Sequence, residues 1–208
     1  MRIIFSNVVK NAGGPALFLD RDGVINRRRP DDYVLDWSQF IFQPGIPEAL
    51  RRLSALGLPM IIISNQSAVG KGLLKPDTLE EITTQLHITL RAEGAILAAA
   101  YYCPHKADEN CSCRKPKPGL LYKAGEDFCV DLTRSVFVGD SDTDVQAARA
   151  AGCTPVLFGN GLSASFSSEW TAHLPTALTA AELFDVVAKC LQAENKPVPV
   201  ETFDNDMG

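Results

Sequence analysis

The chain has 208 residues, of which 46% are hydrophobic and 22% are charged, so it has enough apolar material for one compact domain with a full core. This balance argues against a disordered chain, a fibrous repeat or a small disulfide scaffold. The net charge is −5, and the 20 lysines and arginines are spread along the chain. A nucleic-acid-binding surface needs a concentrated basic surplus, so we expect no nucleic-acid partner.

The sequence carries no sign of a membrane or secretory segment. No stretch approaches the ~20 apolar residues of a membrane-spanning helix, and residues 1–10 lack the features of a secretory signal. We therefore expect a cytoplasmic protein without a membrane partner. Six cysteines are too few for a disulfide framework in a chain of this length. Because the pattern leaves no apolar helix face unpaired, we also expect a monomer.

Short apolar runs alternate along the chain with segments of helical spacing. In chain order, the pattern predicts a strand at 16–20, a helix over Ile46, Leu50 and Leu53, and a strand at 60–63. A helix over Leu79, Ile82, Leu86 and Leu90 follows, and then strands at 98–102 and 135–138. The last predicted elements are a helix at 143–151 ended by Gly152, a strand at 154–158 and a helix at 179–192. Continuous apolar runs are typical of parallel strands buried on both faces. The alternation predicts a doubly wound α/β fold with a mostly parallel, Rossmann-like sheet.

This pattern also predicts the domain organisation. We expect a single domain at 15–192, an N-terminal extension at 1–14, and a polar tail at 193–208 that is flexible. The segment between Asp22 and Ile46 is too short for a separate cap domain, and the segment after Ser67 leaves no room for one. Short loops would then determine the substrate specificity.

Polar residues follow three of the predicted strands. Asp20 and Asp22 are two residues apart on an extended chain, so their carboxylates point to the same side. Such a pair suits a nucleophile with an acid/base partner, or two ligands of Mg²⁺. Residues 64–67 offer hydroxyl, amide and backbone N–H donors for phosphate oxygens, and Asp140 could complete the cation site.

Each of these segments alone could be only a turn or a helix N-cap. Their shared position at the carboxyl ends of strands, where open parallel sheets bind ligands, indicates a catalytic site.

A cluster of cysteine and histidine lies at 103–113. Cys103, His105, Cys111 and Cys113 provide three thiolates and an imidazole, the composition of a closed tetrahedral Zn²⁺ site. Four protein ligands leave no position open for water, so we expect the zinc to be structural. The alternative is a set of incidental loop cysteines beside an exposed histidine. The remaining cysteines, Cys129, Cys153 and Cys190, lie in apolar contexts and are predicted to be core residues.

Four of these segments resemble the motifs of the haloacid dehalogenase superfamily of phosphatases. They are the sequence LDRDGVIN at 19–26, SNQS at 64–67, Lys115-Pro116 and Gly139-Asp140. More narrowly, CPH at 103–105 with CSCRKPKPG at 111–119 resembles the D-glycero-D-manno-heptose 1,7-bisphosphate phosphatase branch, and histidinol-phosphatase domains carry a similar cluster. The resemblance covers about residues 16–158.

The resemblance implies a mechanism. Asp20 would be the nucleophile that forms an aspartyl-phosphate, and Asp22 would protonate the leaving oxygen and then activate water. The Asp20 carboxylate, the Asp22 backbone carbonyl and the Asp140 carboxylate would bind a catalytic Mg²⁺. Ser64 and Lys115 would complete the catalytic set by stabilising the transferred phosphoryl group. The expected substrate contacts are Asn26, Arg28, Tyr33, Asn65, Gln66, Ser67, Arg114 and Ser141.

The resemblance also implies a small phosphorylated substrate, of which heptose 1,7-bisphosphate, cleaved at C7, is the leading candidate. Arg114 would then recognise the second phosphate. Histidinol phosphate is an alternative, weakly favoured by Asp31 and Asp32 because carboxylates near the mouth suit a cationic amine. A zinc-stabilised binding module without catalysis is a remote alternative. The loop at 26–33 is longer than usual for the family and Ala68 replaces a frequent glycine, which leaves the sugar and its anomer open.

Overall fold

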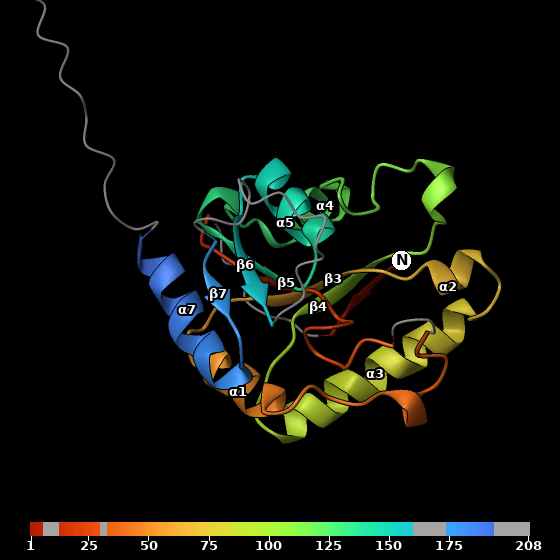
Figure 1. The fold of residues 1–208 in the computed structure, drawn as a ribbon, viewed down its shortest axis with the longest axis horizontal. Coiled ribbons are helices and arrows are strands. Elements are labelled where there is room, and N and C mark those ends of the chain that lie inside the picture. The colour runs from red at the N-terminus through yellow and green to blue at the C-terminus, as the bar shows by residue number, and fades with distance from the viewer. Residues whose placement is uncertain (6–12, 30–32, 160–173, 194–208) are drawn as a thin grey trace, which may run out of the picture.

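The computed structural model describes residues 1–5, 13–29, 33–159 and 174–193. These residues form a seven-stranded sheet with helices on both faces (Figure 1). The strands are β1 (Arg2–Ile4), β2 (Leu17–Leu19), β3 (Met60–Asn65), β4 (Ala99–Cys103), β5 (Val136–Gly139), β6 (Thr154–Phe158) and β7 (Thr176–Ala177). Their order in the sheet is β1-β4-β3-β2-β5-β6-β7, and every pairing is parallel except that of β1 with β4. The predicted α/β fold class is confirmed.

The helices divide between the two faces of the sheet. They are α1 (Ile46–Ser54), α2 (Ser67–Gly70), α3 (Pro76–Ala92), α4 (Gly119–Phe128), α5 (Asp142–Ala151) and α7 (Ala180–Ala193), with 3₁₀ turns η1 (Trp37–Gln39), η2 (Ala107–Glu109) and η3 (Leu132–Arg134). Helices α1, α3 and α7 cover one face, and α4 and α5 cover the other (Figure 1). No described helix is long and apolar enough to cross a membrane.

Strand β2 lies at the centre of the sheet and contributes to both cores. Leu17 and Leu19 pack on the side of α1, α3 and α7, whereas Phe18 packs on the side of α4 and α5. All three side chains are almost completely buried, because helices cover both faces of a parallel sheet. Burial on both sides explains the unbroken apolar run in the sequence. It also fixes where β2 ends, and therefore where Asp20 lies.

Helix α5 shows how local sequence sets an element next to the candidate site. Ser141 is its N-cap, and Asp144 accepts hydrogen bonds from the backbone of Ser141 in a capping box. The helix ends at Gly152, whose φ of 84° lies in the left-handed region that glycine tolerates. These signals hold the N-terminus of α5 at the carboxyl end of β5.

The structure also contains elements that the sequence patterns did not predict. Strand β1 pairs along the edge of β4, and β7 pairs with β6. Helix α4 was not predicted either, although Leu120, Ala124 and Phe128 recur at intervals of four residues on its buried face. The prediction for Cys129 is wrong. This residue follows α4 in a left-handed conformation with φ 53° and is exposed, whereas Cys153 and Cys190 are buried. The predicted tail beyond residue 193 lies outside the described residues.

Candidate active site

A cavity of about 430 Å³ opens at the carboxyl ends of β2, β3 and β5. Its lining residues are Asp20, Asp22, Arg28, Arg29, Tyr33, Val34, Ser64, Asn65, Lys71, Lys115, Ser141, Thr143 and Asp144. The parallel register of β2 with β3 and β5 brings the three polar strand ends to one edge of the sheet. The cavity is therefore where the topology of an open α/β sheet places a ligand.

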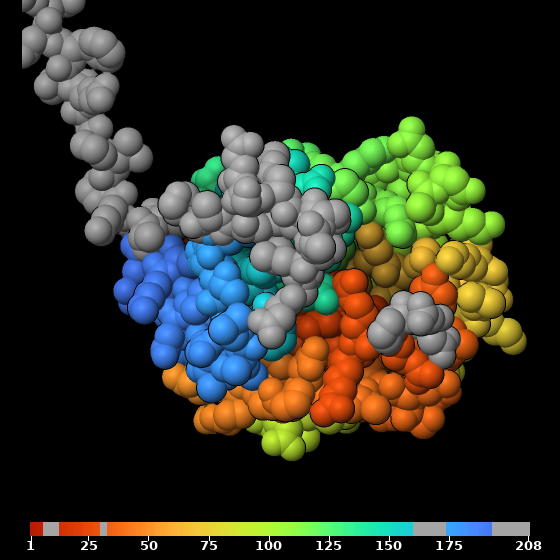
Figure 2. All heavy atoms as spheres, viewed as in Figure 1, coloured from red at the N-terminus to blue at the C-terminus, as the bar shows by residue number. Residues whose placement is uncertain are grey.

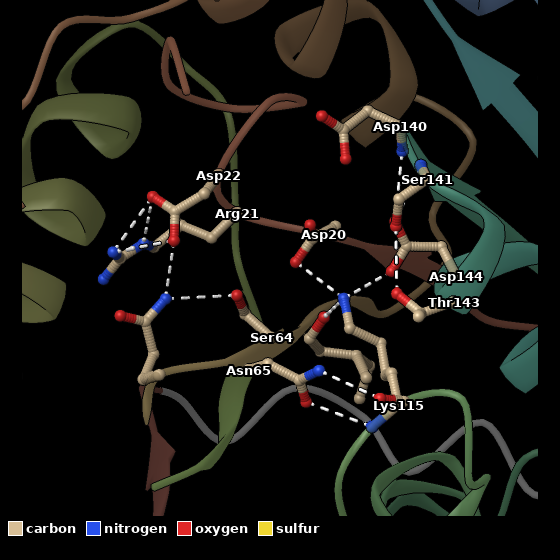
Figure 3. A network of polar contacts seen from close by, with 12 residues as sticks. Asp20, Arg21, Asp22, Ser64, Asn65, Lys115, Asp140, Ser141, Thr143 and Asp144 are labelled. Atoms are coloured by element: carbon tan, nitrogen blue, oxygen red, sulfur yellow. Dashed lines mark hydrogen bonds and ion pairs between the residues drawn. The ribbon is translucent and has the colours of Figure 1, made fainter. Parts of the chain in front are cut away.

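Lys115 lies between two buried carboxylates at the floor of the cavity (Figure 3). Its Nζ is 2.8 Å from Asp20 Oδ1 and 2.5 Å from Asp144 Oδ1, and it donates a hydrogen bond to the backbone carbonyl of Ile63. Burial alone would lower the pKa of Lys115, but the two carboxylates outweigh it and raise that pKa. The ammonium group therefore stays charged beside Asp20.

Asp20 is almost fully buried, which raises the pKa of its carboxyl group to about 6. Lys115 lowers this pKa, and the negative charges of Asp144 and Asp22 raise it again. A carboxylate that has lost much of its hydration and still faces the cavity suits nucleophilic attack, provided that cations offset its repulsion from a phosphate.

Asp22 is oriented by three neighbouring side chains, of which Figure 3 labels Arg21. Arg21 donates to both carboxylate oxygens at 3.0 Å, Asn26 donates to Oδ1 at 2.9 Å, and Gln66 donates to Oδ2 at 2.7 Å. Burial opposes ionisation of Asp22, but Arg21 and the donated hydrogen bonds outweigh it and lower the pKa. Asn26 and Gln66 were predicted to contact substrate. The structure buries both side chains against Asp22, and Gln66 also donates to Ser64 Oγ.

Carboxylate oxygens of Asp20, Asp140 and Asp144 lie within 4.8 Å of one another. Burial and the charge of Asp20 raise the pKa of Asp140 to about 7, and Arg28, which donates to Asp140 Oδ1 at 2.7 Å, opposes this rise. Gly23 has φ 101°, and a Cβ built there would lie 1.8 Å from Asp140 Oδ2. The turn after Asp22 thus packs its backbone against Asp140, and the clustered oxygen donors fit a Mg²⁺ ion.

Two further predicted residues support this cluster. The side-chain amide of Asn65 donates to the backbone carbonyl of Lys115 and accepts from its N–H, both at 3.1 Å. Ser141 Oγ donates to Asp144 Oδ2 at 2.6 Å. Both residues line the cavity, yet each also holds a charged partner in place.

The predicted residues Tyr33, Ser67 and Arg114 lie farther from Asp20. Tyr33 accepts a hydrogen bond from Lys71 at 2.8 Å at the cavity wall, and Ser67 is the first residue of α2. Arg114 lines an adjoining cavity of about 390 Å³, which shares Asn65, Lys115 and Thr143 with the first. Asp31 and Asp32 lie outside the described residues.

The four predicted zinc ligands form a compact cluster. Their donor atoms lie within 4.8 Å of one another, and none of the cysteines forms a disulfide. Cys103 Sγ is 3.5 Å from Cys111 Sγ and 3.3 Å from Cys113 Sγ, and His105 Nδ1 is 3.3 Å from Cys113 Sγ. Zn–S bonds of about 2.3 Å in a tetrahedron require S–S separations near ~3.8 Å. The cluster therefore fits a Zn²⁺ ion with small adjustments.

Comparisons with known proteins show the family to which the chain belongs. The HAD-hydrolase-like family profile matches residues 112–186. A D-glycero-beta-D-manno-heptose-1,7-bisphosphate 7-phosphatase of Pseudomonas aeruginosa is 43% identical over 145 residues, which are 70% of this chain and 81% of that protein. The chain belongs to this family of haloacid dehalogenase-type phosphatases. It is therefore a phosphoric monoester hydrolase, as its motifs predicted.

Other members of the family differ in the anomer that their names give. A D-glycero-alpha-D-manno-heptose-1,7-bisphosphate 7-phosphatase of Mycobacterium tuberculosis is 38% identical over 165 residues, covering 74% of this chain and 87% of that protein. The crystal structure of D,D-heptose 1,7-bisphosphate phosphatase from B. bronchiseptica, complexed with magnesium and phosphate, superposes with a TM-score of 0.73 at 34% identity. That match covers 86% of this chain and 99% of the other.

Three residues that contact the predicted site residues were not predicted from the sequence. Asp144 pairs with Lys115, Arg21 holds Asp22, and Lys71 contacts Tyr33. The spacing of Ser141 and Asp144 is that of a capping box, which would have placed Asp144 at the strand end beside Asp140. Arg21 carries no comparable motif although it binds its chain neighbour Asp22, and the contact of Lys71 with Tyr33 joins two separate loops.

Proposed function

We propose that the protein is a Mg²⁺-dependent phosphatase that hydrolyses the C7 phosphate of D-glycero-D-manno-heptose 1,7-bisphosphate. The observation that carries the proposal is the buried arrangement of Asp20 against Lys115 at the cavity floor, with Asp22 held beside it. This arrangement supplies a nucleophile, a fixed cation and an acid/base group at one point. The relatives named for heptose 1,7-bisphosphate support the choice of substrate.

In the proposed mechanism, a carboxylate oxygen of Asp20 attacks the phosphorus, and the bond from phosphorus to the C7 oxygen breaks. Asp22, once protonated, gives its proton to the departing oxygen, which leaves as the sugar hydroxyl. Asp22 then takes a proton from a water molecule that attacks the aspartyl-phosphate, and Asp20 is released with inorganic phosphate. Lys115 keeps its proton throughout and attracts the phosphoryl oxygens.

The proposed Mg²⁺ ligands are the carboxylates of Asp20 and Asp140 and the backbone carbonyl of Asp22. Bound there, the ion would neutralise charge on the phosphate and so reduce its repulsion from Asp20. Arg28 now pairs with Asp140 at 2.7 Å, which places its guanidinium beside the same site, where it can reach a phosphate oxygen. The four-ligand cluster at 103–113 is proposed to hold a structural Zn²⁺.

The remaining residues are assigned to substrate and its immediate support. Ser64 and Asn65 would donate to the transferred phosphoryl group, and Arg114 would face the second phosphate. Arg28, Tyr33, Ser67 and Ser141 would bound the sugar, whereas Asn26 and Gln66 would act on it through Asp22.

We further propose that the enzyme acts in the cytoplasm as a monomer, on a free small molecule and without a nucleic-acid or membrane partner. The net charge of −5 and the scattered lysines and arginines support the absence of a nucleic-acid partner. Size-exclusion chromatography with light scattering tests the monomer directly, and a dimer mass would overturn it.

Histidinol phosphate is the second candidate substrate. Arg28, Arg29 and Lys71 line the described part of the cavity together with Lys115, and this collection of cations disfavours an amine substrate. Asp31 and Asp32, which favoured this substrate in the sequence, lie outside the described residues. A non-catalytic binding module would lack a use for the buried pair of Asp20 and Lys115.

The deciding experiment measures phosphate release with Mg²⁺ from three substrates: the α and β anomers of heptose 1,7-bisphosphate, and histidinol phosphate. A preference of about 10²-fold for one heptose anomer corresponds to ~2.7 kcal/mol of transition-state discrimination and would fix both substrate and anomer. A preference for histidinol phosphate would contradict the proposed substrate but leave the roles of Asp20 and Asp22 intact. Absence of release from all three would favour a binding module.

A further inference from the structure

Lys71 lies on the wall of the active-site cavity, and the roles proposed above assign it no contact with the heptose bisphosphate. Its Nζ donates a hydrogen bond to Tyr33 Oη at 2.8 Å and lies 5.3 Å from the centre of that ring. Within the described part of the chain, no carboxylate lies at ion-pair distance from Lys71, whereas Lys115 and Arg28 both pair with aspartates. Among the described residues, the hydrogen-bond partner of this positive charge is therefore the neutral phenol of Tyr33.

The position of Lys71 is fixed by the packing of α2 on the zinc loop, residues 103–113. The backbone N–H of Lys71 donates to the carbonyl of Ser67, and that of Gly70 donates to the carbonyl of Pro104, both at 3.0 Å. A Cβ on Gly70 would lie 2.6 Å from the Pro104 carbonyl, so the close approach requires glycine. The two segments lie side by side in the space-filling view (Figure 2).

Three loops converge near the side chain of Lys71. Tyr33 follows β2, Lys71 follows β3, and Arg114 belongs to the segment after β4. Hydrogen bonds from Lys71 and Ser67 and the positive charge of Arg114 all lower the pKa of the Tyr33 phenol. Lys71 lines this cavity and Arg114 lines the adjoining one, so the two cations approach the Tyr33 hydroxyl group from separate loops.

We propose that Lys71, with Tyr33 as its hydrogen-bond partner, determines specificity for a bisphosphate by binding the phosphate group that is not hydrolysed. The inference rests on the proposed function and names a contact that the sequence motifs did not. A phosphate at the mouth gains a charge-assisted hydrogen bond from Nζ, and Tyr33 holds Nζ in place for it. A substrate whose distant end is an ammonium group would be repelled by the same charge.

The test compares heptose 1,7-bisphosphate with heptose 7-phosphate, both cleaved at C7, in the wild type and in three variants. Lys71→Ala removes the contact and Lys71→Arg restores the charge. Lys75→Ala is the matched control, because Lys75 is an exposed lysine nearby in the sequence and does not line the cavity. Inhibition by inorganic phosphate is measured in parallel, as a measure of phosphate binding at the subsite where the C7 phosphate reacts.

For Lys71→Ala we expect the KM for the bisphosphate to rise about tenfold or more, the size of one lost charged hydrogen bond. The kcat, the KM for the monophosphate and the inhibition by phosphate should stay within about twofold. Lys71→Arg should recover most of the affinity, and Lys75→Ala should behave as the wild type.

Two results would overturn the inference alone: an unchanged KM for the bisphosphate, or an equal rise in KM for both substrates. A wild-type enzyme that releases phosphate from neither heptose ester would overturn the proposed substrate, and the inference would fail with it.

Discussion

The reacting end of the cavity and its mouth are built in different ways. Asp20 lies at the end of a strand, Lys115 lies in a loop that is hydrogen-bonded to the sheet, and both are almost fully buried. Lys115 forms ion pairs of 2.8 Å or less with Asp20 and with Asp144. At the mouth, Tyr33 and Lys71 are partly or largely exposed and come from separate loops. The first region takes its geometry from the register of the sheet, and the second takes it from loop-to-loop contacts.

We expect the reacting end to determine the rate of the reaction and the mouth to determine the substrate specificity. A change at the reacting end alters buried charges that contact one another directly, so it should affect turnover strongly. A change at the mouth should alter the KM for the substrate, because water can solvate the groups left behind. Variants in the two regions should therefore have effects of different size and kind.

The largest expected effect is that of Asp20→Asn. An amide cannot act as the nucleophile, so kcat should fall on the order of 10⁴-fold or more. The fold should persist, because the substitution keeps the shape of the side chain and removes a buried charge. Phosphate release and circular dichroism measure the two properties. Residual turnover near the wild-type value would contradict the nucleophilic role.

Asp144→Asn should have the next largest effect. Lys115 would keep Asp20 as its single carboxylate partner, so its ammonium would move relative to the phosphoryl group, and kcat should fall about 10²-fold. The isosteric amide preserves much of the helix cap. The matched control is Asp142→Asn, in the same first turn of α5 but outside the cavity. Equal losses of activity in the two variants would show that helix charge, rather than Lys115, is responsible.

Loss of a zinc ligand should act on stability and on KM more than on kcat. Cys113→Ser should lower the free energy of unfolding by about 2–4 kcal/mol, because the loop at 103–113 loses its cross-link. The KM should rise, since the loop carries Arg114 and contacts Gly70. Metal analysis should find zinc in the wild type and in Cys129→Ser, an exposed thiol that serves as control. A zinc-free wild type of full stability would contradict the structural role.

The smallest effect is expected far from the cavity. Asp127 accepts hydrogen bonds from Arg2 at 2.7 Å, Tyr101 at 2.8 Å and Lys123 at 2.9 Å, which tie β1 and β4 to α4. Asp127→Asn should cost about 1 kcal/mol of stability and leave kcat and KM unchanged. A large change in activity would show that the reacting end or the mouth of the cavity depends on the contacts of Asp127 with β1 and β4.

Asp127 should also make the free energy of unfolding depend on pH. Burial raises the pKa of Asp127, but the hydrogen bonds from Arg2, Lys123 and Tyr101 outweigh it and lower that pKa from 3.8 to about 2. The folded state therefore favours the ionised form, so the stabilisation is present above pH ~4 and is lost as the pH falls toward ~2. Urea unfolding of the wild type and Asp127→Asn should converge over this range. A constant difference would contradict the shifted pKa.

The sequence predicted the central strands and their polar ends because these features are local. A run such as Met60–Ile63 is apolar throughout, and the residues that follow it must leave the sheet. Strand β1 was missed because it is a short edge strand of alternating exposure, whose pairing with β4 spans about half the chain. Helix α4 had a usable signal in Leu120, Ala124 and Phe128, which lie on one face.

The site was predictable in its residue types but not in its contacts. The motif at 64–67 predicted donors for phosphate, yet Gln66 donates to Asp22 across two strand ends, which only the sheet register determines. Likewise, nothing near Lys71 in the sequence indicates Tyr33, 38 residues away. Such pairs depend on how separate loops meet, and a single sequence carries no local pattern for that.

The most direct measurement of the central claim traps the covalent intermediate. The Asp22→Asn variant lacks the acid/base group, so a substrate with a good leaving group, such as acetyl phosphate, is used to form the aspartyl-phosphate. Hydrolysis of this intermediate should then become the slow step, because no group takes the proton from water. Acid quenching followed by peptide mass spectrometry should then find one phosphoryl group, on Asp20. A phosphoryl group on another residue, or an Asp20→Asn variant that still releases phosphate at the wild-type rate, would contradict the account.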